Sequence, residues 1–118
     1  MENLKKYIDA IENTDCGKMI EGDTSGDFIT LSYAVYSPIV HEMIEDFFAS
    51  DLVDYNYNET APELLDNFEA MIHTMTVKQV GSCLTYIFRV DRFCEGLILA
   101  NLENGRIAAL LKRLLELA

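Results

Sequence analysis

The chain has 118 residues, a length at which we expect one domain spanning residues 1–118. Half of its residues are hydrophobic and a quarter are charged, which is typical of a globular protein rather than a disordered one. Twenty acidic residues against nine basic ones give a net charge of −11, which argues against direct binding to nucleic acid or to anionic membranes.

The first residues predict an amphipathic helix over residues 2–14. Its apolar positions recur at helical spacing: Leu4, Tyr7, Ile8 and Ile11. The next segment changes to a period of two, with Ile29, Leu31, Tyr33 and Val35 alternating with smaller or polar residues. We therefore expect one short β hairpin or extended segment near residues 18–36, supported by helices.

Three further helix starts carry recognisable local signals. Ser37-Pro38 combines an N-cap hydroxyl with a proline at the first helical position. Thr60 and Glu63 have the spacing of a capping box, and the apolar run behind them predicts one helix to Met75. Thr76 and Gln79 repeat this spacing, so a fourth helix is predicted from residue 77.

Glycines divide the last third of the chain. The helical periodicity is interrupted near Gly96 and continues over residues 97–102. It ends at Asn104-Gly105, and a last helix is predicted over residues 106–117. The small residues Gly81, Ser82 and Cys83 predict a place where helices pack closely. The sequence thus predicts a mainly α fold: a compact bundle of five to six helices with one short β element.

The charge is distributed unevenly along the chain. Residues 1–75 hold three basic and sixteen acidic residues, whereas residues 76–118 hold six basic and four acidic ones. The acidic part has two interpretations: helix faces exposed to water, or a surface that docks a basic partner. Within it, a loop with two tyrosines is the candidate interaction surface, and its suspected residues are Asp51, Asp54, Tyr55, Tyr57 and Glu59.

Chemical motifs are weak. The loop begins like a calcium site at Asp54, but Glu59 and Leu65 stand where glycine and a bidentate glutamate are needed. His41 and His73 each have a glutamate one turn away, on the polar side of their helices. We therefore expect no metal and no other cofactor.

Cysteine usage and the absence of targeting features bear on the compartment. The three cysteines, an odd number without paired spacing, argue against a disulfide framework. Residues 1–13 lack the apolar core of a secretory signal, and no apolar run approaches the roughly 20 residues that span a bilayer. We expect a cytoplasmic protein with free thiols and no membrane contact.

Two groups of motifs resemble a family of short bacterial proteins known only as a domain of unknown function. The first is Tyr36-Ser37-Pro38-Ile39-Val40, followed by Asp54-Tyr55. The second runs from Leu84-Thr85-Tyr86-Ile87-Phe88-Arg89 through Arg92-Phe93-Cys94-Glu95-Gly96 to the last helix. The resemblance covers about residues 30–117 and implies no activity, substrate or cofactor. Leu97 departs from it, because a more polar residue usually follows the glycine.

The resemblance singles out one patch: Arg89, Arg92, Cys94, Glu95 and Gly96. Arg89 and Arg92 are one helical turn apart, and Glu95 follows one turn later. One interpretation is an arginine–glutamate pair that holds a helix corner together. The other is a binding site, or an active site, for an anionic small molecule.

The leading hypothesis is a non-enzymatic cytoplasmic module that binds an unidentified protein partner. The last helix has more leucines than one core-facing stripe can bury. The apolar surface left exposed predicts a homodimer. Two alternatives stay open: a small-molecule binder or enzyme at the Arg89–Glu95 patch, and an acidic mimic that blocks a nucleic-acid-binding partner.

Overall fold

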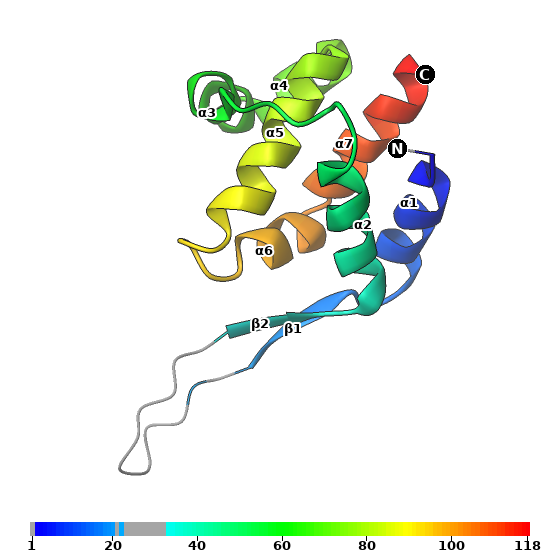
Figure 1. The fold of residues 1–118 in the computed structure, drawn as a ribbon, viewed down its shortest axis with the longest axis vertical. Helices are drawn as coiled ribbons and strands as arrows, with labels where there is room; N and C mark the ends of the chain where they lie inside the picture. Colours follow the sequence, from blue (N-terminus) through cyan, green and yellow to red (C-terminus); the bar gives the residue numbers. More distant parts are fainter. Residues whose placement is uncertain (1, 21, 23–32) are drawn as a thin grey trace.

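The structure, a computed structural model, describes residues 2–20, 22 and 33–118. Its described part is mainly α-helical with one antiparallel hairpin, so the expected fold class is confirmed (Figure 1). The elements, in chain order, are α1 (Leu4–Asn13), β1 (Gly17–Ile20), β2 (Tyr33–Tyr36), α2 (Pro38–Phe48), α3 (Tyr57–Asp66), α4 (Phe68–Met71), the 3-10 turn η1 (Ile72–Thr74), α5 (Val77–Val90), α6 (Leu97–Glu103) and α7 (Arg106–Leu117).

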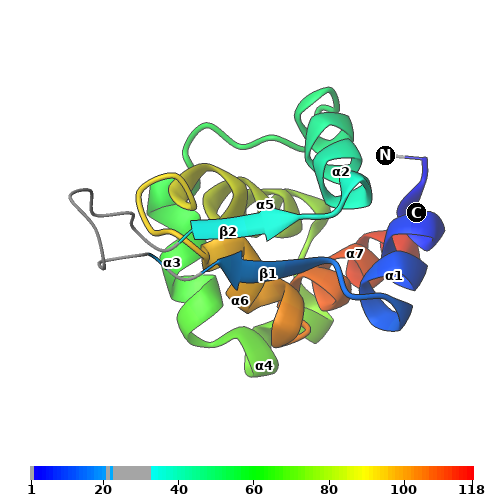
Figure 2. The same cartoon turned by 90° about the horizontal axis from the view of Figure 1, so that it is seen from below.

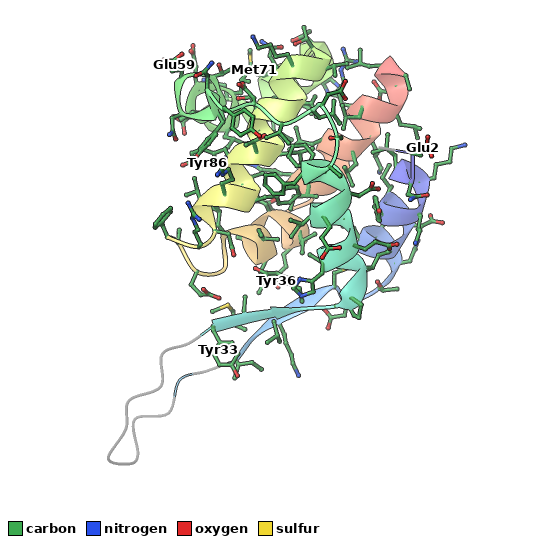
Figure 3. All side chains as sticks on the ribbon, viewed as in Figure 1. Glu2, Tyr33, Tyr36, Glu59, Met71 and Tyr86 are labelled. Carbon is green, nitrogen blue, oxygen red and sulfur yellow. The ribbon has the colours of Figure 1, made fainter. Side chains whose placement is uncertain are left out.

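The hairpin lies across one end of the helices: it is below them in Figure 1 and in front of α5 and α6 in Figure 2. Its register pairs Gly17 with Tyr36 and Ile20 with Tyr33, and the Ser37 N–H extends the ladder with a 2.8 Å hydrogen bond to the Cys16 carbonyl. Tyr36 faces the helices whereas Tyr33 lies on the opposite side (Figure 3). The alternation at residues 29 and 31 lies outside the described residues.

Local signals predicted several helix ends correctly. Thr76 and Gln79 form the expected capping box: Thr76 Oγ1 accepts from the Gln79 N–H at 3.2 Å, and Gln79 Oε1 accepts from the Thr76 N–H at 2.9 Å. Ser37 and Pro38 occupy the N-cap and first positions of α2, although the Ser37 hydroxyl makes no capping hydrogen bond to a described residue. Gly96 and Gly105, with φ of 87° and 82°, adopt the left-handed conformation that starts α6 and α7.

The third predicted helix differs from the observed one. The expected capping box at Thr60 is wrong, because α3 begins at Tyr57, whose ring packs edge-on against Tyr86 with centroids 6.2 Å apart. The predicted continuous helix to Met75 is also interrupted after α3. Asn67 Nδ2 donates to the Glu63 carbonyl at 3.1 Å, and such side-chain bonds compete with the regular helical ladder.

The core is built around α5, which packs against α3, α6 and α7. Its residues from Val80 to Thr85 are all buried, and α1 closes the far side against α7 and α2. Among the described residues, no helix has the length and apolar character needed to cross a membrane. At the end of α5, the suspected patch begins: Arg89 lies in the last turn of the helix and Arg92 in the turn that follows it.

Candidate functional site

The loop of residues 49–56 packs against one edge of α5. Gly81, Thr85 and Arg89 follow each other at intervals of four along this edge. The loop backbone passes so close to Gly81 that a Cβ there would lie 2.1 Å from the Leu52 carbonyl oxygen. One turn later, Thr85 Oγ1 donates to the Gly81 carbonyl at 2.6 Å and accepts from the Asp54 N–H at 3.1 Å.

Because the loop is held against Gly81 and Thr85, Tyr55 lies beside Arg89. The Arg89 guanidinium carbon lies over the Tyr55 ring, 5.9 Å from its centroid. Arg92, one turn further along the chain, lies over the Phe93 ring at 4.9 Å. The two rings are 79% and 77% exposed, so both arginine–aromatic pairs are at the surface.

Between these groups lies an open groove of about 420 Å³, which we call the arginine groove. Its lining residues are Phe48, Tyr55, Phe88, Arg89 and Arg92. The apolar part is anchored to the core: Phe47 is fully buried, and its ring contacts those of Phe48 and Phe88 with centroids 5.3 and 5.4 Å apart. The groove therefore combines a fixed aromatic wall with two cationic groups.

Neither arginine of the groove has an acidic partner within the described residues. Arg106 and Arg113, in contrast, lie 3.8 and 3.0 Å from the carboxylates of Glu69 and Glu116. The arginine–glutamate pair considered for the corner is not formed. Instead, Glu95 Oε1 accepts a 2.7 Å hydrogen bond from the Ala34 N–H of β2.

Glu95 and Gly96 of the suspected patch, together with the neighbouring Asp91, contact the hairpin. Asp91 Oδ1 accepts a 2.9 Å hydrogen bond from the Ile98 N–H and lies 3.5 Å from the Tyr36 hydroxyl. Burial, with the adjacent Asp91 carboxylate, raises the pKa of Tyr36 to about 12. A Cβ on Gly96 would lie 3.3 Å from the Met19 sulfur. The corner thus divides into a groove-lining part and a hairpin-holding part.

The family model of DUF6508, a family of unknown function, matches residues 1–118. The chain belongs to this family. The expected resemblance to a family without a known activity is confirmed. No curated protein and no solved structure matches the chain. Any function for this DUF6508 chain must therefore be argued from its own geometry.

The cysteines of the DUF6508 chain differ in their surroundings. Cys94 is exposed at the corner but does not line the arginine groove. Cys16 and Cys83 are buried, and burial raises the pKa of the Cys83 thiol to about 12. Each described cysteine is a free thiol, and the structure does not place Cys94 with Arg89 and Arg92 at one site.

The suspected acidic interaction surface is divided among different places. Tyr55 lines the arginine groove, while Asp51 and Asp54 line a second groove of about 410 Å³ beside the start of α5. Tyr57 packs against α5, and Glu59 is exposed on the outer side of α3 (Figure 3). These five residues do not form one continuous site.

The histidines and their neighbouring glutamates also lie apart. Glu69 is near Arg106, and the His41 ring contacts Tyr36 edge-on with centroids 6.3 Å apart. Within the part of the chain that the structure describes, no three histidine, cysteine or acidic side chains come together to hold a metal. The arginine groove brings together residues from three separate segments: Phe48, Tyr55 and the end of α5 with the turn after it.

Proposed function

We propose that this chain is a small acidic cytoplasmic interaction module without catalytic activity, and that it contacts a partner protein through the arginine groove. One observation carries the proposal: two highly exposed aromatic rings stand beside two arginines that have no acidic partner among the described residues. Aromatic residues and arginine are enriched at protein interfaces and dominate their binding energy.

The openness of the groove favours a protein partner over a small molecule. Pockets for small ligands usually bury most of the ligand surface, whereas a wall formed by Tyr55, at 79% exposure, encloses little. The small-molecule alternative also required Cys94 and Glu95 at the same site. Neither residue lines the groove, and Glu95 binds the hairpin instead.

Affinity capture with a matched pair of variants tests this function. The tagged wild-type chain is compared with the Tyr55→Ala/Phe93→Ala variant and with Tyr33→Ala, which removes an exposed ring from the hairpin. We expect specific proteins to be recovered with the wild type and with Tyr33→Ala, and to be lost with the double variant. Recovery of the same proteins with all three baits would contradict the proposal.

The same experiment addresses the acidic-mimic alternative. A mimic would recover proteins that bind nucleic acid, and it would retain them when the exposed Tyr55 and Phe93 rings are removed. Its acidic groups lie mainly in residues 1–75, a part of the sequence that does not include Arg89 and Arg92. Recovery of nucleic-acid-binding proteins by the Tyr55→Ala/Phe93→Ala variant would therefore favour the acidic surface over the groove as the interaction surface.

A further inference from the structure

The arginines of the groove differ from the other arginines in what their guanidinium groups contact. Arg106 and Arg113 face carboxylates, and Arg106 also lies over the Phe68 ring at 5.1 Å. Arg89 and Arg92 contact aromatic rings but form no ion pair within residues 2–20, 22 and 33–118. The chain carries twenty acidic residues, so acidic partners are abundant in the sequence. Among the described residues, no acidic side chain pairs with either of these two guanidinium groups.

The aromatic contacts of the two arginines do not use their hydrogen-bond donors. A cation–π contact is an attraction between the positive charge and the ring face, so the N–H groups stay available to other partners. Neither Arg89 nor Arg92 donates a hydrogen bond to any described residue. Each guanidinium therefore keeps the planar fork of donors that matches a carboxylate in a bidentate manner.

The residues beside these N–H donors indicate what a ligand should carry next to its anionic group. Phe48 is 40% exposed and Phe88 is 8% exposed, and both line the groove beside the guanidinium groups. This wall offers apolar area to a side chain that enters next to the anionic group. Its contacts with the buried Phe47 ring hold it in one arrangement, so little ordering is needed on binding.

We propose that the arginine groove binds a segment of a partner protein in which an acidic side chain stands next to an aromatic or aliphatic one. The carboxylate pairs with Arg89 and Arg92, and the apolar neighbour packs against Phe48 and Phe88. This inference rests on the proposed function and adds the chemistry of the partner. The complementarity is local: a cationic groove on a chain whose net charge is −11 selects an anionic ligand at close range.

The test uses short random peptides displayed as a library and selected on the full-length chain. Enriched sequences are then measured against Arg89→Gln/Arg92→Gln and against a control, Lys5→Gln/Lys78→Gln. Both variants lose two positive charges, and the two lysines form no ion pair among the described residues and do not line the groove. Since the groove arginines make no polar contacts in the described chain, we expect both variants to fold.

We expect enriched peptides to contain an acidic residue beside an aromatic or aliphatic one. Their affinity is expected to fall on the order of tenfold for each arginine removed and to stay unchanged in the lysine control. Peptides without acidic residues, or equal losses in both variants, would overturn the inference.

Two further outcomes separate this inference from the proposed function. Peptides that bind the wild type and the arginine variant equally would refute the groove as an acidic-ligand site, while a protein-binding function would stand. A complete lack of enriched peptides would also overturn the inference, and the aromatic variants in the capture experiment would still decide whether a partner protein exists.

Discussion

The Asp54 N–H donates a 3.1 Å hydrogen bond to Thr85 Oγ1, and this bond joins a loop to a helix 31 residues further along the chain. The residue after Asp54 is Tyr55, and the residue one turn after Thr85 is Arg89. The bond thereby places an aromatic ring against a guanidinium group. The arginine groove exists because the loop is held at this point.

Replacing Thr85 tests the importance of this bond. Thr85→Val keeps the branched shape but leaves the Asp54 N–H without its acceptor, which we expect to lower the free energy of unfolding by about 1–2 kcal/mol. Thr85→Ser retains the hydroxyl and should lose much less. Urea unfolding measures both values, and equal losses in the two variants would show that the hydroxyl does not anchor the loop.

Gly81→Ala should be destabilising although alanine normally favours a helix over glycine by about 1 kcal/mol. The added Cβ would lie 2.1 Å from the Leu52 carbonyl oxygen, so the loop must move. We expect a loss of about 1–3 kcal/mol, the range typical of overpacking, together with weaker contact between Tyr55 and Arg89. Increased thermal stability of Gly81→Ala would contradict the close approach of this loop.

The three cysteines should differ in reactivity. Cys94 is exposed, whereas Cys16 and Cys83 are buried and the pKa of Cys83 is raised to about 12. Alkylation of the folded chain followed by peptide mass spectrometry should modify Cys94 first, and the other two only after unfolding. Rapid modification of Cys83 in the folded chain would contradict its burial in α5.

The stability of the chain should fall at alkaline pH. Burial raises the pKa of Tyr7 and Tyr36 from 10.0 to about 12, and that of Cys83 from 9.0 to about 12. The unfolded chain releases these protons at lower pH than the folded one. The contribution of the three groups is therefore fully present below about pH 9 and is lost as the pH rises toward 12.

Unfolding measured at several pH values between about 8 and 11 tests this dependence. Tyr36→Phe should lower the stability near neutral pH, because it removes the hydroxyl that accepts from the Leu99 N–H at 3.2 Å. It should also reduce the slope of stability against pH above about pH 10. An identical slope in the wild type and the variant would contradict the raised pKa of Tyr36.

The predicted homodimer depends on the last helix. Leu110, Leu111 and Leu114 are buried in the core, which accounts for most of the excess leucine, whereas Leu115 and Leu117 are each 38% exposed. If a second copy covers these two residues, sedimentation should give twice the monomer mass, and Leu115→Glu should reduce it to the monomer. A monomeric wild type at the same concentration would refute the dimer.

Elements defined by local signals could be predicted from the sequence. The capping residues Thr76 and Gln79, the pair Ser37-Pro38 and the stop at Gly105 act within a few residues, and each marks an observed helix end. The start of α3 could not be predicted in this way. It depends on the packing of Tyr57 against a ring 29 positions away, which no local pattern reveals.

The site was predictable only in part, for the same reason. Arg89, Arg92 and Tyr55 are conspicuous in the sequence, but Phe48 and Phe88 read as ordinary apolar positions of amphipathic helices. Small residues around Gly81 indicated a close helix–helix contact, whereas the structure brings a loop to that position. Ring packing of Phe47 and Phe48 against Phe88 joins α2 to α5, and the path of the loop adds Tyr55 to them.

In our proposal, Arg89 and Arg92 carry recognition of an acidic partner segment. The dissociation constant of one enriched acidic peptide should therefore be measured for the wild type, for Arg89→Gln/Arg92→Gln and for Lys5→Gln/Lys78→Gln. The proposal predicts on the order of a hundredfold weaker binding for the arginine variant and wild-type binding for the lysine variant. Equal dissociation constants for all three proteins would contradict it.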